Sequence, residues 1–194
     1  RALLMKRVGL FGGTFDPVHK GHVAVARSFL QSGAIDELWV VLTPHPPHKQ
    51  AREKAGYDDR YRMLTLAFQH FDDISISTIE NELPQPSYTV RTIRHLQEKH
   101  PETKFYLCIG QDSLRHFDEW YRVEEILDRV NLLVAERPGV DSRNVDPQIL
   151  EHVIFIQHEP VEASSTRVRK ANGFKPEDLP EPVADYIEKK GLYQ

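Results

Sequence analysis

Short apolar runs alternate with segments of helical periodicity along most of this chain. The runs 7–11, 38–42, 105–109, 132–135 and 153–156 are mostly apolar, and residues 74–79 alternate between apolar and polar as a strand does. Apolar positions recur at helical spacing in 21–30, 62–68, 88–100 and 182–190. Continuous apolar runs are typical of strands covered on both faces of a parallel sheet. The alternation predicts an α/β fold: a doubly wound, Rossmann-like, mostly parallel sheet with helices on both faces and a small C-terminal closing helix. The weakly patterned segment 139–151 is expected to be a surface loop.

Length and composition limit the classes of protein to consider. The 194 residues suit one domain, 1–194, and Met5 stands just before the first expected strand, so residues 1–4 are interpreted as an upstream extension or a cloning remnant. Hydrophobic residues make up 40% and charged residues 28%, an ordinary globular balance, and the apolar runs are too short to span a membrane. The single cysteine, Cys108, cannot form an internal disulfide, which favours the cytoplasm. A net charge of -4 argues against a nucleic-acid partner.

The strongest chemical signal is the string from Gly12 to His22. A strand ends there, Gly12 and Gly13 allow close backbone approach, and a helix begins near Gly21, so free amides and the positive helix end favour phosphate. The spacing fits neither a Walker loop nor a dinucleotide-binding G-x-G-x-x-G motif. His19 and His22 are three residues apart, which places both imidazoles on one helix face. They could donate to phosphate oxygens; alternatively, they are surface residues or half of a metal site.

A second anion site is predicted near the C-terminus. Ser165 and Thr166 are good N-cap residues for a short helix, and Arg169 follows one turn later. The alternative is a capped surface helix with solvated arginines.

Gly110 and Asp112 follow the clearest buried strand, at a sheet end where open α/β folds bind ligands. The Asp112 carboxylate could accept ribose hydroxyls or cap a helix expected over 113–117. Trp120 lies in a polar stretch, where its ring could stack on a flat ligand or cover the core.

As a whole, the string from Gly12 to His22 resembles the nucleotidyltransferase signature (T/H)xGH, and it is most similar to the nicotinate-nucleotide adenylyltransferase branch. The resemblance extends over nearly the whole chain, including Ser164 to Arg169. It implies transfer of the adenylyl group of ATP to nicotinate mononucleotide, giving deamido-NAD and pyrophosphate in NAD biosynthesis. It also implies Mg²⁺ carried with ATP, and a homodimer by family habit; no protein ligand of a metal is identified.

The resemblance assigns residues to each substrate. Catalysis is assigned to His19, His22 and Arg169. ATP binding is assigned to Gly12, Gly13, Thr14, Phe15, His19, His22, Gly110, Asp112, Arg137, Ser165, Thr166 and Arg169. Acceptor binding is assigned to Lys49, Ser87, Tyr88, Thr89, Trp120 and Tyr121, with the ring carboxylate bound by the backbone amides of Thr89 and Tyr121.

The chain departs from the family pattern at a few positions, and two other functions stay open. Ala163 and Val168 replace larger or different aliphatic residues, which concerns packing, and Asp59 replaces a histidine before Arg60, so no role is given to Arg60. A related transferase would use nicotinamide mononucleotide, phosphopantetheine or glycerol phosphate as acceptor. A non-catalytic nucleotide-binding protein would have less need of His19, His22 and Arg169 together.

Overall fold

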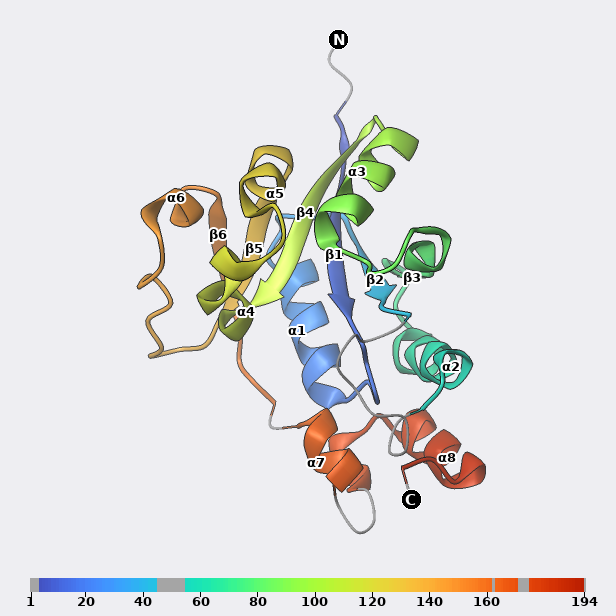
Figure 1. Ribbon diagram of the computed structural model, residues 1–194. Coiled ribbons are helices and arrows are strands. Elements are labelled where there is room, and N and C mark those ends of the chain that lie inside the picture. The colour runs from blue at the N-terminus through green and yellow to red at the C-terminus, as the bar shows by residue number, and fades with distance from the viewer. Residues whose placement is uncertain (1–3, 45–54, 162, 171–174, 194) are drawn as a thin grey trace.

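A computed structural model describes residues 4–44, 55–161, 163–170 and 175–193 (Figure 1). Its sheet is formed by six parallel strands in the order β3-β2-β1-β4-β5-β6. The strands are β1 (Lys6–Gly13), β2 (Glu37–Leu42), β3 (Ile74–Ser77), β4 (Thr103–Gly110), β5 (Asn131–Glu136) and β6 (Val153–Gln157). This order reverses between β1 and β4, and a crevice at such a point is where doubly wound sheets bind their ligands. The predicted α/β fold is confirmed.

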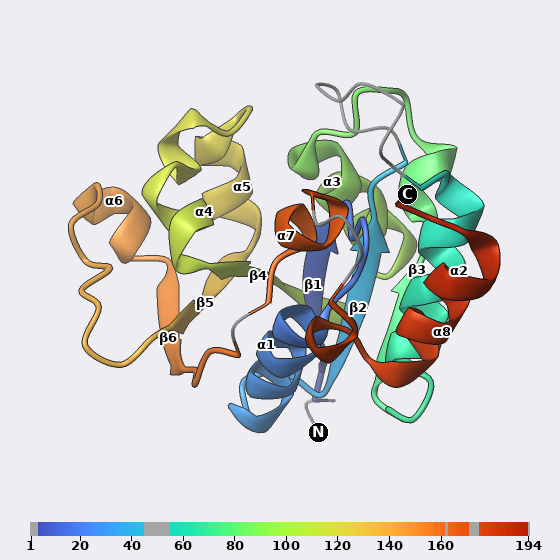
Figure 2. The ribbon, with the colours of Figure 1, turned by 90° about the horizontal axis from the view of Figure 1, so that it is seen from below.

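Helices cover both faces of the sheet. They are α1 (Lys20–Gln31), α2 (Tyr57–Phe68), α3 (Thr89–Lys99), α4 (Gln111–Arg115), α5 (Val123–Arg129), α6 (Pro147–Leu150), α7 (Ser165–Lys170) and α8 (Glu181–Lys190), with 3₁₀ turns η2 (Ile79–Glu82), η3 (Phe117–Glu119) and η4 (Pro176–Asp178). Figure 2 shows α1 and α8 on one side of the sheet and α3, α4 and α5 on the other. Each layer has its own core, around Phe29 and Met63 on one face and Ile93 and Phe117 on the other.

Several element boundaries differ from the sequence expectations. The strand expected over 74–79 ends at Ser77 and continues as η2, and α2 begins five residues earlier than the pattern predicts. The segment 139–151 was wrongly expected to be loop throughout, because Asp146 caps α6 within it by accepting the amide of Gln148. In the described ranges, no helix has both the length and the apolar character needed to cross a membrane.

Candidate active site

The two histidines of the first motif hold each other at the start of α1. His19 is the N-cap: its Nδ1 accepts the amides of Gly21 (3.0 Å) and His22 (3.3 Å). The Nδ1 of His22 accepts the amide of His19 in return (3.1 Å), which completes a capping box made of imidazoles. The rings stack with centroids 3.6 Å apart. Because each Nδ1 is an acceptor, the proton of each neutral ring is on Nε2, and both histidines present an Nε2–H donor.

The surroundings keep His22 neutral. Burial lowers its pKa well below the ordinary histidine value, and the neighbouring His19 lowers it further. Gly21 makes the arrangement possible, since a Cβ there would lie 2.8 Å from Cε1 of the folded-back His19 ring. His22 therefore offers a hydrogen-bond donor and no fixed positive charge at neutral pH.

The second motif, Ser164 to Arg169, lies against the first motif, Gly12 to His22. Arg169 Nη1 donates to the carbonyl of Asp16 (2.6 Å), and Ser165 Oγ donates to the carbonyl of Pro17 (2.8 Å). Figure 1 shows α7 beside the start of α1 accordingly. Helix α7 begins at Ser165, so the hydroxyl expected to cap the helix binds the neighbouring loop instead. The side chain of Thr166 lies outside the described residues.

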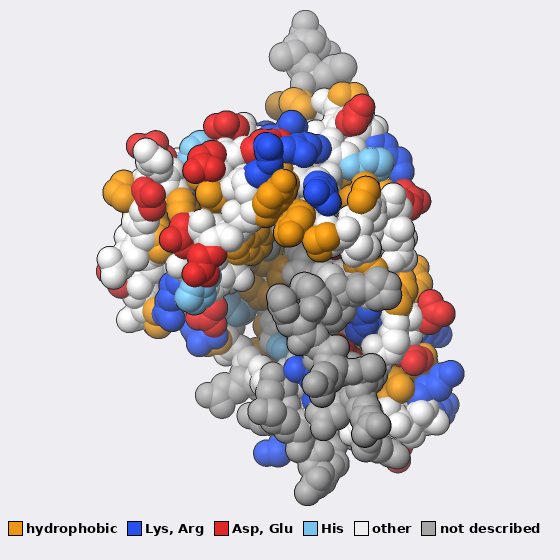
Figure 3. All heavy atoms as spheres, in the orientation of Figure 1, with side chains coloured by type: hydrophobic (Ala, Val, Ile, Leu, Met, Phe, Trp, Pro, Cys, Tyr) orange, Lys and Arg blue, Asp and Glu red, His pale blue; other side chains and the backbone are white. Residues whose placement is uncertain are grey.

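A cavity of about 570 Å³ opens beside the histidines. Five of the predicted nucleotide residues line it: His19, His22, Gly110, Asp112 and Arg137. The alternative N-cap role for Asp112 is wrong, because Gly110 holds the cap position of α4 and the Asp112 side chain is 85% exposed. His158, which the sequence did not single out, also lines this cavity. Figure 3 shows a hollow in this region, with hydrophobic and histidine side chains in its depth.

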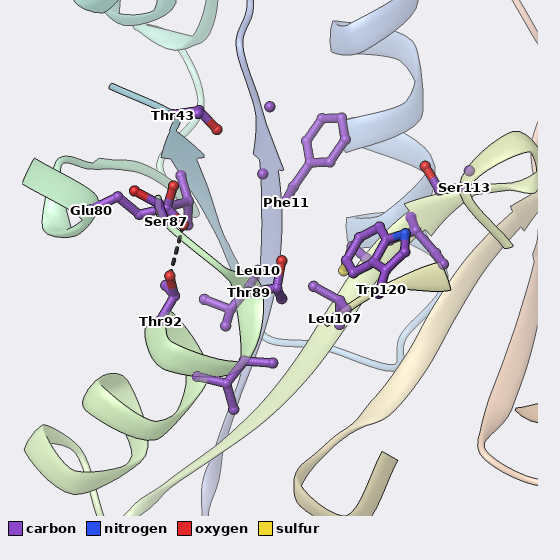
Figure 4. Close-up of a pocket in the computed structure, with 17 residues that line it drawn as sticks. Leu10, Phe11, Thr43, Glu80, Ser87, Thr89, Thr92, Leu107, Ser113 and Trp120 are labelled. Atoms are coloured by element: carbon purple, nitrogen blue, oxygen red, sulfur yellow. Dashed lines mark hydrogen bonds between the residues drawn. The ribbon is translucent and has the colours of Figure 1, made fainter. Parts of the chain in front are cut away.

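A second cavity, of about 290 Å³, lies next to the first. Phe11, Gly110 and Ser113 line both. The remaining predicted residues on its walls are Gly12, Gly13, Ser87, Thr89 and Trp120. Figure 4 shows the Trp120 indole on one wall and Ser87 on the opposite one. The Trp120 ring packs against Phe117 with centroids 4.8 Å apart, which holds the indole in place.

Other predicted residues lie outside both cavities. The rings of Tyr88 and Tyr121 stack on each other 4.3 Å apart, with Arg91 over both. Phe15 is buried and packs edge-on against His22 at 4.9 Å, so its side chain supports the histidine pair. The carbonyl of Thr14 accepts a hydrogen bond from Arg60. Lys49 lies outside the described residues.

The cytidylyltransferase-like family model matches residues 10–171. A probable nicotinate-nucleotide adenylyltransferase of Geobacillus thermodenitrificans is 38% identical over 97% of this chain and 87% of its own length. The nicotinate-nucleotide adenylyltransferase of Bacillus subtilis is 34% identical over 98% of this chain and its entire length. This chain belongs to the nicotinate-nucleotide adenylyltransferases. The Plasmodium falciparum nicotinic acid mononucleotide adenylyltransferase, solved with APC, has the same fold: its TM-score is 0.78 at 21% identity, with 97% of both chains covered.

In this member of the nicotinate-nucleotide adenylyltransferases, Arg60 has a clear structural role that the sequence left undecided. Its guanidinium is buried and donates to the carbonyls of Thr14 (2.9 Å), Thr43 (2.8 Å) and Pro44 (2.8 Å). Arg60 therefore ties the turn after β1 to the loop after β2. The preceding Asp59 accepts the hydroxyl of Tyr186 at 2.6 Å.

Asp16 connects the first motif to the end of the chain through hydrogen bonds, and the sequence did not predict this role. Its buried carboxylate accepts the amide of Ala55 (3.1 Å) and the hydroxyl of Tyr193, and its carbonyl accepts Arg169. A short-range pattern cannot reveal such a contact, because Asp16 and Tyr193 are separated by nearly the whole chain. Glu80 and Thr92, which line the smaller cavity, were missed for the same reason.

Proposed function

We propose that this enzyme joins the α-phosphate of Mg-ATP to the 5′-phosphate of nicotinate mononucleotide, forming deamido-NAD and pyrophosphate. One observation carries the proposal: two adjoining cavities share Phe11, Gly110 and Ser113, with the histidine pair in the larger one and Trp120 in the smaller one. This arrangement suits a reaction that joins two nucleotides end to end. The relatives named as nicotinate-nucleotide adenylyltransferases support the same choice of substrates.

The chemistry requires positioning and charge stabilisation more than a base. An oxygen of the ionised acceptor phosphate attacks the α-phosphorus, a new P–O bond forms, and the bond to the β-phosphate breaks as pyrophosphate leaves with its magnesium. The Nε2–H groups of His19 and His22 suit the charge that develops on the transferred phosphate. Arg169 is assigned to the leaving phosphates. Gly12, Gly13, Ser165 and Thr166 are assigned to the anion cradle.

The smaller cavity is proposed to hold the pyridine ring. Trp120 would stack on the ring, Ser87 and Thr89 would form the opposite wall, and the amides of Thr89 and Tyr121 would bind the ring carboxylate. We also propose that the enzyme is a homodimer and that residues 1–194 form a single domain. A cytoplasmic location is proposed because Cys108 is free and buried.

A pyrophosphate-release assay tests the function directly. The protein is mixed with Mg-ATP and, separately, with nicotinate mononucleotide, nicotinamide mononucleotide, phosphopantetheine or glycerol phosphate. We expect the nicotinate acceptor to give the highest kcat/KM, with deamido-NAD identified by mass. Release with another acceptor alone would reassign the substrate, and ATP binding without release would indicate a non-catalytic protein.

Substitution of Trp120 tests the placement of the acceptor. Loss of ring stacking costs about 1–3 kcal/mol, so Trp120→Ala should raise the acceptor KM roughly tenfold or more and leave the KM for ATP unchanged. Trp39→Ala is the matched control, because Trp39 lies on β2 outside both cavities and donates to Glu37. An unaltered acceptor KM in Trp120→Ala would remove the indole from the site.

A further inference from the structure

Glu80 is the acidic side chain that lines the smaller cavity. It lies on η2 between β3 and α3, is only 7% exposed, and accepts the Thr92 hydroxyl on Oε2 at 2.8 Å (Figure 4). In the described part of the chain, Oε1 has no hydrogen-bond partner. Glu80 and Trp120 line the same cavity, and Figure 4 shows them on opposite sides of it. A ring bound against the indole in this cavity would therefore share the cavity with a buried carboxyl group.

No cation compensates this carboxyl group among the described residues that line the cavity, where Lys, Arg, His and Asp are absent. The nearby arginines of α3 are engaged elsewhere, Arg91 over Tyr88 and Tyr121 and Arg94 with Glu125.

Within 4–44, 55–161, 163–170 and 175–193, the other carboxyl groups near Glu80 are paired with a cation or exposed. On β2, Glu37 pairs with Lys6 at 2.8 Å, and on η2 itself Glu82 is exposed. On α3, Glu98 and Lys99 are exposed, and His95 makes no contribution to the pKa of Glu80. The other titratable lining group, the Cys108 thiol, has a pKa raised by burial, so it is neutral.

We propose that Glu80 selects the substituent on the pyridine ring of the acceptor, donating from Oε1 to a ring carboxylate when it is itself protonated. This inference rests on the proposed function. In the ionised form Glu80 would repel the carboxylate and would instead accept an N–H of a ring carboxamide. Protonated Glu80 would then favour the acid substrate, and ionised Glu80 would favour the amide substrate.

The protonated form is accessible near neutral pH. Burial raises the pKa of Glu80 to about 7, although the Thr92 hydrogen bond lowers it. Above that pH the protonated fraction falls about tenfold per pH unit, so the KM for nicotinate mononucleotide should rise and the KM for nicotinamide mononucleotide should fall. The acceptor phosphate, with a second pKa of about 6, is already ionised between pH 7 and 9 and does not contribute to the change.

The experiment compares the wild type with Glu80→Gln. Glutamine keeps the shape and donates at every pH, so the KM for the acid should become independent of pH between 7 and 9 and lie at least tenfold below the wild-type value at pH 9. The matched control is Glu82→Gln, which removes an exposed carboxyl from the same turn and should follow the wild type. A Glu80→Gln profile that rises as in the wild type would overturn the proposal.

Proton uptake on binding of nicotinate mononucleotide separates this role of Glu80 from a structural one, because a purely structural Glu80 would take up no proton. Binding of nicotinate mononucleotide at pH 8 should take up close to one proton in the wild type, measured by titration calorimetry in buffers of different ionisation enthalpy, and none in Glu80→Gln. If Glu80→Gln does not fold, Thr92→Val serves instead. Loss of its hydrogen bond should raise the pKa of Glu80 and move the pH profile upward. Wild-type turnover without proton uptake would defeat this inference alone, whereas absence of turnover would defeat the proposed function.

Discussion

At the scale of single residues, His19 has a structural role and a proposed chemical role that can be separated. Its Nδ1 caps α1, and the proposed function assigns its Nε2–H to phosphate. Asparagine is a good N-cap whose oxygen can accept the same amides, but it has no donor in the place of Nε2–H. His19→Asn should therefore keep the melting temperature and lose turnover by roughly 10²–10³-fold, as when one transition-state donor is removed elsewhere.

The control for this prediction is His19→Ala, which removes both functions. It should lose a similar amount of turnover and, in addition, about 1 kcal/mol of folding free energy, measured by urea denaturation. Full activity of His19→Asn would show that the imidazole serves the helix cap and nothing more.

Sequence patterns predicted arrangements that depend on residues close together in the chain. The string from Gly12 to His22 predicted that His19 and His22 lie together at the start of a helix, because strand, turn and helix start are contiguous. The same pattern could not reveal that Glu80 faces Trp120, since a buried carboxyl in a 3₁₀ turn looks like any exposed one in sequence. The stacking of Tyr88 on Tyr121 was equally hidden, because it depends on how α3 and the η3–α5 turn meet.

At the scale of elements, helix α7 is placed by contacts from its side chains rather than by its own stability. Six residues are too few for a stable isolated helix, and Ser165 and Arg169 fasten it to Pro17 and Asp16. The sequence predicted five of the six strands because they are apolar almost throughout, and it predicted β3 because apolar and polar residues alternate there. The sequence predicted helices less well where the N-cap residue sets the first residue of the helix, as at α6 and α4.

Arg60 links the two loops that border the site, and this leads to a prediction on stability. Arg60→Met keeps much of the volume but leaves the carbonyls of Thr14, Thr43 and Pro44 without their donors. Each buried group left unsatisfied costs about 1–3 kcal/mol, so we expect a loss of roughly 3 kcal/mol or more in the free energy of unfolding. Arg62→Met, an exposed arginine on the same helix, should change stability by less than about 0.5 kcal/mol. Equal urea midpoints for the two variants would contradict the structural role of Arg60.

At the scale of the whole molecule, the end of the chain reaches back to the first motif. Tyr193 follows α8 and is held in the left-handed backbone region at φ 62°, with its hydroxyl on the Asp16 carboxylate. The Asp16 and Pro17 carbonyls receive Arg169 and Ser165. Tyr193 thus contacts the same turn, Asp16 and Pro17, that binds Arg169 and Ser165 of α7.

This arrangement predicts a kinetic effect far from the acceptor site. Tyr193→Phe removes one donor from a buried carboxylate, so the turn and Arg169 should lose their fixed position relative to the histidine pair. We expect kcat/KM for Mg-ATP to fall several-fold while the KM for nicotinate mononucleotide stays within about twofold, because small misplacements of catalytic groups are costly. Tyr186→Phe is the matched control: it removes a hydroxyl that joins α8 to Asp59 on α2, away from both cavities. If the two variants show the same kinetics and differ only in melting temperature, Tyr193 stabilises the fold without positioning the phosphate site.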